Sequence, residues 1–91
     1  IPSFDPEHSR FDSKRYWRGP VWAIINYIVA RGLAEYGFER EANRIRLDTR
    51  EIIRGSGFYE YFDPICGSGA GGRHFAWTAA IWLAWASPMT D

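Results

Sequence analysis

Two of the three helix-like segments of the chain are apolar on nearly every face, and this feature most constrains the fold. The first covers residues 20–36, with Pro20 in a favoured first-turn position and Gly37 as a natural end. The other runs over about residues 75–86 and stops at Ser87-Pro88. Because a helix that is apolar all round is buried on all sides, both segments need covering elements.

The segment between them, roughly residues 39–54, is amphipathic instead. One stripe at helical spacing carries Phe38, Ala42, Ile45, Thr49 and Ile52. Charged side chains lie mostly outside that stripe, and they are Glu39, Arg40, Arg44, Arg46, Asp48, Arg50, Glu51 and Arg54. The spacings of Arg44–Asp48 and Glu51–Arg54 allow ion pairs on the exposed face. We therefore expect an outer helix with one buried face and one solvent-exposed face.

The order is thus buried helix, surface helix, buried helix. An α/α toroid alternates inner and outer helices in this way, with loops at one end that line a central cavity. A free three-helix bundle would instead show three amphipathic helices of similar character. Two buried helices cannot cover each other in so short a chain, so we interpret the all-α chain as an inner-outer-inner arc of a larger barrel.

Charge and cysteine content exclude several classes of function. The formal net charge is +0, which gives no electrostatic reason to expect a nucleic acid or an anionic membrane as partner. The first apolar run is too short and interrupted to span a membrane. Cys66 is the one cysteine, and neither His8 nor His74 has a ligand-like spacing to it. We expect no metal and no cofactor, and, with no signal peptide at the start, a cytoplasmic location.

Two aromatic segments carry the candidate site. They read Tyr16-Trp17-Arg18-Gly19-Pro20-Val21-Trp22 and Phe58-Tyr59-Glu60-Tyr61-Phe62-Asp63-Pro64. Flat rings stack on the apolar faces of a pyranose, and a carboxylate binds hydroxyls or activates a water. Aromatic residues make up 18% of the chain, more than a small core needs, so many rings should face a ligand or a neighbouring part of a larger protein. Together the two segments favour part of a glycoside hydrolase.

Each charged candidate has two interpretations. Glu60 suits a general base, since the hydroxyls of its flanking tyrosines would orient it and their rings would exclude water; a surface or capping glutamate is the alternative. Arg18 would grip a substrate carboxylate by a two-pronged contact, or else hold loop carbonyls or a neighbouring acid. Asp63, directly before Pro64, is expected to cap a turn rather than to act as a second carboxylate.

The remaining candidates are also open. Trp17 and Trp22 either stack on sugar or belong to the core, and His74 either lines the site or makes a hydrogen bond at a helix start. The run Gly67-Ser68-Gly69-Ala70-Gly71-Gly72 lacks the preceding buried strand and the following Lys-Ser/Thr of a phosphate loop. We expect a flexible loop that acts as a mobile lid over the pocket.

At these residues the chain resembles a known family. The first aromatic segment, followed by Asn26-Tyr27, is similar to a segment of glycoside hydrolase family 63. The second aromatic segment, the glycine-rich loop and Phe75-Ala76-Trp77-Thr78-Ala79-Ala80 resemble the C-terminal region of that family in the same order. Within the group, the chain is most similar to the mannosylglycerate and glucosylglycerate hydrolases. The resemblance covers nearly the whole chain, from about Asp5 to Trp85.

The resemblance implies an (α/α)6 barrel, of which residues 1–91 form a C-terminal segment, and inverting hydrolysis of a small α-glycoside such as glucosylglycerate or mannosylglycerate. On the matching positions Glu60 would be the general base. The sugar pocket would be lined by Tyr16, Trp17, Arg18, Trp22, Tyr59, His74 and Trp77. The general acid of the family is an aspartate much further towards the N-terminus, which this chain does not contain, so we expect the isolated chain to be inactive.

The expected partners are a small glycoside substrate and the remainder of the barrel or another copy of the chain. A glucosidase acting on oligosaccharides, or a trehalase-like enzyme, would share the barrel and the base. A non-catalytic, aromatic-rich helical module that binds sugar or a partner chain is the alternative to an enzyme.

Overall fold

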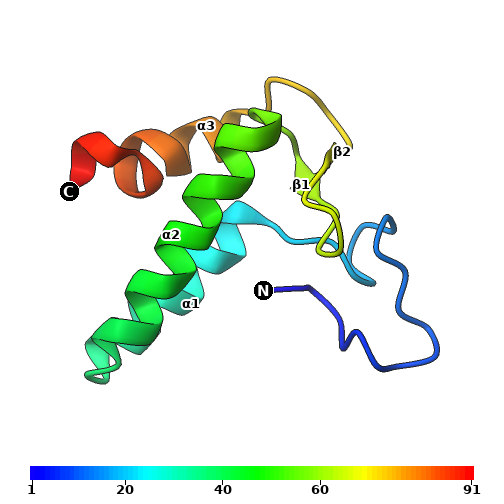
Figure 1. Cartoon of the computed structure of the whole chain (residues 1–91), viewed down its shortest axis with the longest axis horizontal. Helices are drawn as coiled ribbons and strands as arrows, with labels where there is room; N and C mark the ends of the chain where they lie inside the picture. The colour runs from blue at the N-terminus through cyan, green and yellow to red at the C-terminus, as the bar shows by residue number, and fades with distance from the viewer.

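A pair of packed helices forms the framework of the chain. The computed structural model describes all residues from Ile1 to Asp91, with α1 (Ala23–Glu35) and α2 (Glu39–Ser56) side by side (Figure 1). After α2 come the strands β1 (Tyr61–Phe62) and β2 (Gly69–Ala70), then α3 (Ala76–Ile81). A π-helical turn, η1 (Trp82–Ala86), continues α3 directly, and a 3-10 turn, η2 (Pro88–Thr90), follows. The N-terminal arm and the two strands lie to one side of the helices (Figure 1).

The mostly helical character is confirmed, but the all-α class needs correction because of the small sheet. β1 and β2 pair antiparallel, with Tyr61 opposite Ala70 and Phe62 opposite Gly69. The ladder continues where the Asp63 amide donates to the Ser68 carbonyl over 2.9 Å. Part of the glycine-rich run, expected as a flexible loop that acts as a lid, is therefore strand, and Gly67 belongs to the turn before it, where its amide donates to the Asp63 carbonyl over 2.8 Å.

An exchange of backbone hydrogen bonds joins the start of α1 to β1. The Val21 amide donates to the Phe62 carbonyl over 2.8 Å, and the Phe62 amide donates to the Val21 carbonyl over 2.9 Å. Val21 must be extended to make this antiparallel bridge. As a result α1 begins at Ala23, three residues later than the sequence predicted.

The core lies where this bridge meets the helices. Its buried members are Val21, Ala23, Ile53, Phe62, Ile81 and Ala86. The side chain of Phe62 is 0% exposed. A buried hydrogen bond joins α1 to α2, in which the Asn26 side-chain amide donates to the Thr49 hydroxyl over 2.9 Å. Thr49 in turn donates to the Ile45 carbonyl over 2.8 Å, so both buried polar groups are satisfied.

The two helices predicted to be buried each keep an exposed apolar face. Ile28 on α1 is 57% exposed, and Leu83 on η1 is 76% exposed. Within these residues no element covers either side chain. None of the helices is both long and apolar enough to cross a membrane. The expected cytoplasmic location stays a prediction.

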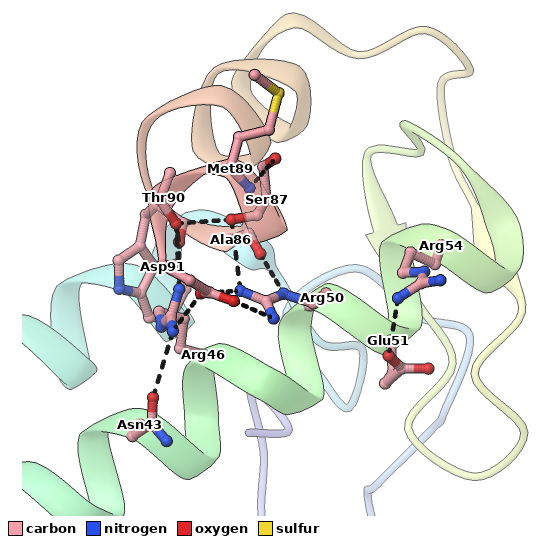
Figure 2. A network of polar contacts seen from close by, with 11 residues as sticks. Asn43, Arg46, Arg50, Glu51, Arg54, Ala86, Ser87, Met89, Thr90 and Asp91 are labelled. Atoms are coloured by element: carbon pink, nitrogen blue, oxygen red, sulfur yellow. Dashed lines mark hydrogen bonds and ion pairs between the residues drawn. The ribbon is translucent and has the colours of Figure 1, made fainter.

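The outer helix α2 departs from the prediction at one residue. Its surface pairs form as predicted, with 3.2 Å between Arg44 and Asp48 and 3.7 Å between Arg54 and Glu51. Arg50, however, is buried and does not belong to the solvent-exposed face. Its guanidinium donates to the Ala86 carbonyl and to the Asp91 carboxylate, over 2.6 Å each (Figure 2).

A second arginine completes this network. The Arg46 guanidinium lies 2.8 Å from the same Asp91 carboxylate (Figure 2). It also donates to the Trp85 carbonyl over 3.3 Å. Hydrogen bonds to charged groups are stronger than neutral ones. The two arginines therefore fasten η1 and η2 onto α2.

Loss of the buried Phe62 side chain should destabilise the chain far more than the same change at an exposed phenylalanine. Phe62→Ala empties a fully buried site in the core, which we expect to cost about 3–5 kcal/mol of unfolding free energy. Phe38→Ala removes the same side chain where it is 52% exposed, and we expect a loss of less than about 1 kcal/mol there. Urea denaturation of the two variants, followed by tryptophan fluorescence, measures the difference. Equal losses would contradict the assigned core.

The Asp91 carboxyl should titrate unusually low. Hydrogen bonds first from Arg50 and then from Arg46 lower the pKa of Asp91 from 3.8 to about 2. Because the folded pKa lies below the ordinary one, the contribution of this contact to stability is present above about pH 4 and is lost as the pH falls through about 2. NMR titration of the Asp91 carboxyl should give a midpoint near 2, and Arg50→Met should move it towards 3.8. An unshifted midpoint in the unaltered chain would refute the network.

Candidate functional site

The Val21–Phe62 bridge brings the two aromatic segments together. Successive side chains of extended backbone point to opposite faces. Because Val21 and Phe62 point into the core, their neighbours Trp22 and Tyr61 point to the opposite face. Their ring centroids lie 5.2 Å apart. The two aromatic segments, which are far apart in the sequence, therefore meet at one place, which a site shared between them needs.

Four rings form a continuous cluster there, and we call them the ring cluster: Tyr16, Trp17, Trp22 and Tyr61. Trp17 stacks on Trp22 with 4.0 Å between centroids and an interplanar angle of 9°. Tyr16 meets Trp22 edge to face at 5.0 Å and Tyr61 at 5.7 Å. Such offset and edge contacts are the favoured geometries for aromatic pairs.

The members of the ring cluster differ in access to solvent. Trp22 is 2% exposed, and its indole N–H donates to the Tyr16 carbonyl over 3.0 Å. Trp17 is 43% exposed and Tyr16 is half exposed. Trp22 therefore supports the cluster from below, and only Trp17, Tyr16 and the partly buried Tyr61 have surface free for a ligand.

Tyr16 has an unusual backbone conformation. Its φ of 35° lies on the left-handed side, where a bulky residue is rare. Strain of this kind persists only where surrounding contacts impose it, and it is concentrated at ligand sites. The bond from the Trp22 indole to the Tyr16 carbonyl is one such contact.

Glu60 directly precedes the first strand, one residue before Tyr61. Its amide donates to the Gly72 carbonyl over 2.8 Å, and its carboxylate oxygen Oε1 accepts from the Gly72 amide over 3.0 Å. We expected tyrosine hydroxyls to orient this carboxylate, but a backbone N–H holds it instead. Tyr61 belongs to the ring cluster and Tyr59 packs against the core, so neither hydroxyl bonds Glu60. Sequence reasoning missed Gly72, because a glycine signals a bulge only within a recognised strand pattern, and no strand was predicted here.

Tyr59 lies between the core and the surface. Its ring covers Gly69 so closely that a Cβ there would collide with it. The Arg73 guanidinium lies 5.8 Å from the ring centroid on the exposed side. The Thr78 hydroxyl donates to the Tyr59 carbonyl over 2.6 Å and so ties α3 to this segment.

His74 and Trp77 flank the start of α3. His74 is exposed, has a φ of 53° and makes no side-chain hydrogen bond in this chain, so the predicted alternative of a bond at the helix start is not seen. Trp77 is exposed and meets Phe75 edge to face at 6.0 Å. The Phe75 amide donates to the Phe58 carbonyl over 2.7 Å, which fixes this region to the second aromatic segment.

Arg18 makes the contact that we named as the alternative to substrate binding. Its Nε and Nη2 atoms both donate to the Arg10 carbonyl over 3.2 Å. With Phe4 and Arg10 it lines a hollow in the N-terminal arm. None of its hydrogen bonds reaches Glu60 or the ring cluster.

Asp63 is a turn anchor, as the sequence predicted. Its buried carboxylate accepts from the Ile65 amide over 2.8 Å and from the Ser13 hydroxyl over 3.3 Å. Burial alone would raise the pKa of Asp63, but hydrogen bonds from Ile65, Cys66 and Ser13 outweigh it and hold the pKa below the ordinary value. The carboxylate is committed to these donors, so Asp63 does not offer a second acid beside Glu60.

Around Glu60 the chain is open. The hollows of the molecule lie between α1 and α2 beside Trp85, along the outer face of α2, near Cys66 and in the N-terminal arm, and Glu60 lines none of them. No three side chains of the kinds that bind metals gather closely enough to hold an ion. The arrangement offers a carboxylate with one oxygen held by backbone and flat rings close by in the chain, which is the chemistry of sugar binding and water activation.

Known proteins are similar to this chain in sequence. The chain is 49% identical over 85 residues to the mannosylglycerate hydrolase MGH1 of Selaginella moellendorffii, a match that covers 93% of the chain and 17% of that protein. It is 33% identical to a glucosylglycerate hydrolase of Mycolicibacterium hassiacum, over 93% of the chain and 19% of that protein.

A solved structure agrees with these relatives. The family 63 mannosylglycerate hydrolase of Thermus thermophilus, in complex with glucose, superimposes with a TM-score of 0.87 at 44% identity, covering 91% of the chain and 22% of that structure. The chain therefore spans less than a quarter of the length of each of these proteins.

A family model confirms the resemblance noted in the sequence. The model of the mannosylglycerate hydrolase MGH1-like glycoside hydrolase domain matches residues 1–78. That range includes both aromatic segments, Glu60 and Gly72, whose amide holds the Glu60 carboxylate. The chain belongs to the family of MGH1-like glycoside hydrolase domains.

Proposed function

We propose that this chain is the base-bearing part of an inverting glycoside hydrolase that cleaves a small α-glycoside such as mannosylglycerate or glucosylglycerate. The observation that carries the proposal is the pairing of Val21 with Phe62, which joins an oriented carboxylate to a cluster of partly exposed rings. The names of the relatives support the choice of substrate.

In this proposal Glu60 is the general base. An inverting enzyme activates a water on one face of the sugar and protonates the leaving oxygen on the other, with the two carboxyl groups about 6.5–9.5 Å apart. The Gly72 amide holds one oxygen of Glu60, and within this chain the other oxygen has no hydrogen bond and is available to take a proton from water. The family resemblance implies that the general acid lies outside residues 1–91, and Asp63, whose carboxylate is held by other donors, does not replace it, so the isolated chain does not turn over substrate.

In this proposal the exposed rings of the two aromatic segments and Arg18 bind the substrate. Trp17 and Tyr16 stack on the sugar, with Trp22 as the support that holds Trp17 flat. Tyr59, His74 and Trp77 line the side of the pocket nearest α3. Arg18 binds the carboxylate of the glycerate group, for which it exchanges its bonds to the Arg10 carbonyl.

We also propose that residues 1–91 form the C-terminal, inner-outer-inner arc of an (α/α)6 barrel. The exposed apolar faces of α1 and η1 support this arrangement, because large apolar patches mark surfaces that a neighbour covers. The relatives are long enough to supply the remaining helices.

Glu60→Gln in the longer protein tests the assignment of the base. The amide keeps the shape of the side chain but cannot take a proton, so we expect kcat to fall at least about a hundredfold with little change in KM. Glu51→Gln is the control, since that exposed carboxylate pairs only with Arg54 on α2. The assay measures sugar released from mannosylglycerate and glucosylglycerate.

Three outcomes would count against this assignment. Turnover by Glu60→Gln at the rate of the unaltered enzyme would remove Glu60 as the base. Release of the α-anomer first, seen by NMR, would contradict inversion of an α-glycoside. Sugar binding without any release by the longer protein would favour the non-catalytic sugar-binding module.

The isolated chain should bind hydrophobic dyes and self-associate. The side chains of Ile28 and Leu83 are exposed and lack covers, so Ile28→Lys combined with Leu83→Lys should lower both dye fluorescence and the sedimenting mass. Glu41→Lys on the exposed face of α2 adds a similar charge as the control. Dye fluorescence of the unaltered chain no higher than that of an ordinary globular protein would argue against covering helices.

A further inference from the structure

We propose that Gly71 is a positioning residue for the reaction, because the absence of a side chain at this position lets the backbone hold the Glu60 carboxylate. The inference rests on the proposed role of Glu60 as the general base. Gly71 touches no substrate and would act through its neighbours, chiefly Glu60. Two observations carry the inference, namely the register of the sheet and the space around Gly71.

The register of the sheet changes at Glu60. Tyr61 pairs with Ala70, so an unbroken ladder would place Glu60 opposite Gly71. Instead, the Glu60 amide donates to the Gly72 carbonyl over 2.8 Å. Two residues that follow β2, Gly71 and Gly72, therefore lie opposite the single residue Glu60 that precedes β1, which is the arrangement of a β-bulge. Gly71 has a φ of 73°, in the left-handed region that glycine adopts without strain.

The bulge gives Glu60 a hydrogen-bond donor that a regular ladder lacks. Bulges re-aim groups next to active sites. Here the Gly72 amide donates to the side-chain oxygen Oε1 of Glu60 over 3.0 Å, while the Gly72 carbonyl accepts from the Glu60 amide. Both polar backbone groups of Gly72 therefore bind Glu60. A carboxylate held by backbone is fixed more firmly than one held by a flexible side chain, and such fixed geometry is what an efficient base needs.

There is no room for a side chain on Gly71. A Cβ there would lie 2.7 Å from Oε1 of Glu60 and 2.9 Å from its Cβ. On another side it would lie 2.7 Å from Cε1 of Tyr61, a member of the ring cluster. Carbon atoms in contact are normally about 3.5–4.0 Å apart. Any larger residue would therefore displace the carboxylate, the Tyr61 ring or both.

Gly67 is a matched control in the same segment. Its φ of 77° is close to that of Gly71, so alanine meets similar backbone strain at both positions. A Cβ on Gly67 would meet no atom within 4 Å. The difference between the two alanine variants therefore reports the contact with Glu60 and Tyr61 rather than the cost of a positive φ.

The test compares Gly71→Ala with Gly67→Ala in the longer protein. Misplacing a catalytic group by about 1 Å costs up to about a hundredfold in rate, so we expect kcat of Gly71→Ala to fall by about 10–100-fold. We expect the KM of Gly71→Ala to change less than about threefold, because the substitution removes no group that binds the substrate in the ground state. We expect Gly67→Ala to keep kcat within about twofold. Equal kcat values for the two variants would overturn the inference.

A second comparison separates positioning from a general loss of structure. In a Glu60→Gln background the base is already absent, so adding Gly71→Ala should lower the residual turnover no further. Independent, multiplying losses would show that Gly71 acts on the fold rather than through Glu60, and would overturn the inference. If Glu60→Gln alone is fully active, the proposed function and the inference fail together. If Glu60→Gln is inactive and Gly71→Ala matches Gly67→Ala, only the inference fails.

A third measurement leaves Gly71 unaltered, in case its alanine variant does not fold. Glu60→Ala removes the acceptor of the Gly72 amide, so hydrogen exchange at Gly72 should speed up at least about tenfold. The Gly67 amide, which donates to the Asp63 carbonyl over 2.8 Å, should exchange at its original rate. An unchanged exchange rate at Gly72 would refute the contact on which the inference depends.

Discussion

The two hydrogen bonds exchanged by Val21 and Phe62 are the interaction on which the rest of the structure depends. Both side chains are buried in the core, so the bonds are shielded from water and no other partner competes for these groups. The bridge keeps Val21 extended and so sets where α1 begins. It also sets where β1 lies, which places the residues next to it, Trp22 and Tyr61, against each other. A helical hairpin alone would leave the two aromatic segments unconnected.

From this bridge outward, hydrogen bonds between side chains and backbone groups build the candidate site. Trp22 holds the Tyr16 carbonyl, Gly72 holds the Glu60 carboxylate, and Asp63 is anchored by the Ile65 amide. Groups fixed in this way need little rearrangement when a substrate arrives, which is the usual source of electrostatic catalysis. The surroundings of Glu60 nevertheless stay open in this chain, in keeping with our proposal that further helices complete the pocket.

Much of the fold was predictable from sequence, because it follows from local patterns. The period of apolar residues indicated the helices, the i,i+4 spacing indicated the Arg44–Asp48 pair, and Asp63 before Pro64 indicated a turn cap. The burial of Arg50 was not predictable, since its acceptors on Ala86 and Asp91 are distant in sequence and charge alone predicts a solvent-exposed face. The small sheet was missed because strands of two residues carry no periodicity.

The candidate site divides in the same way. The residue types and their order indicated part of a glycoside hydrolase, which the family match confirms, while the roles of the site residues stay a prediction. Sequence did not reveal which ring is buried, because Trp17 and Trp22 belong to one motif and only their stacking decides which is covered. Nor did it reveal how Glu60 is held, since that depends on a register shift in the sheet.

The most direct measurement is a crystal structure of the longer protein, as the Glu60→Gln variant, with mannosylglycerate bound. We expect the mannose ring to stack on Trp17 and Tyr16, with residue 60 directed at a water below the anomeric carbon. The general acid should then be identifiable on the opposite face of the ring, contributed by a residue outside this chain. A sugar bound away from both aromatic segments would contradict the central claim that the Val21–Phe62 bridge assembles the active site.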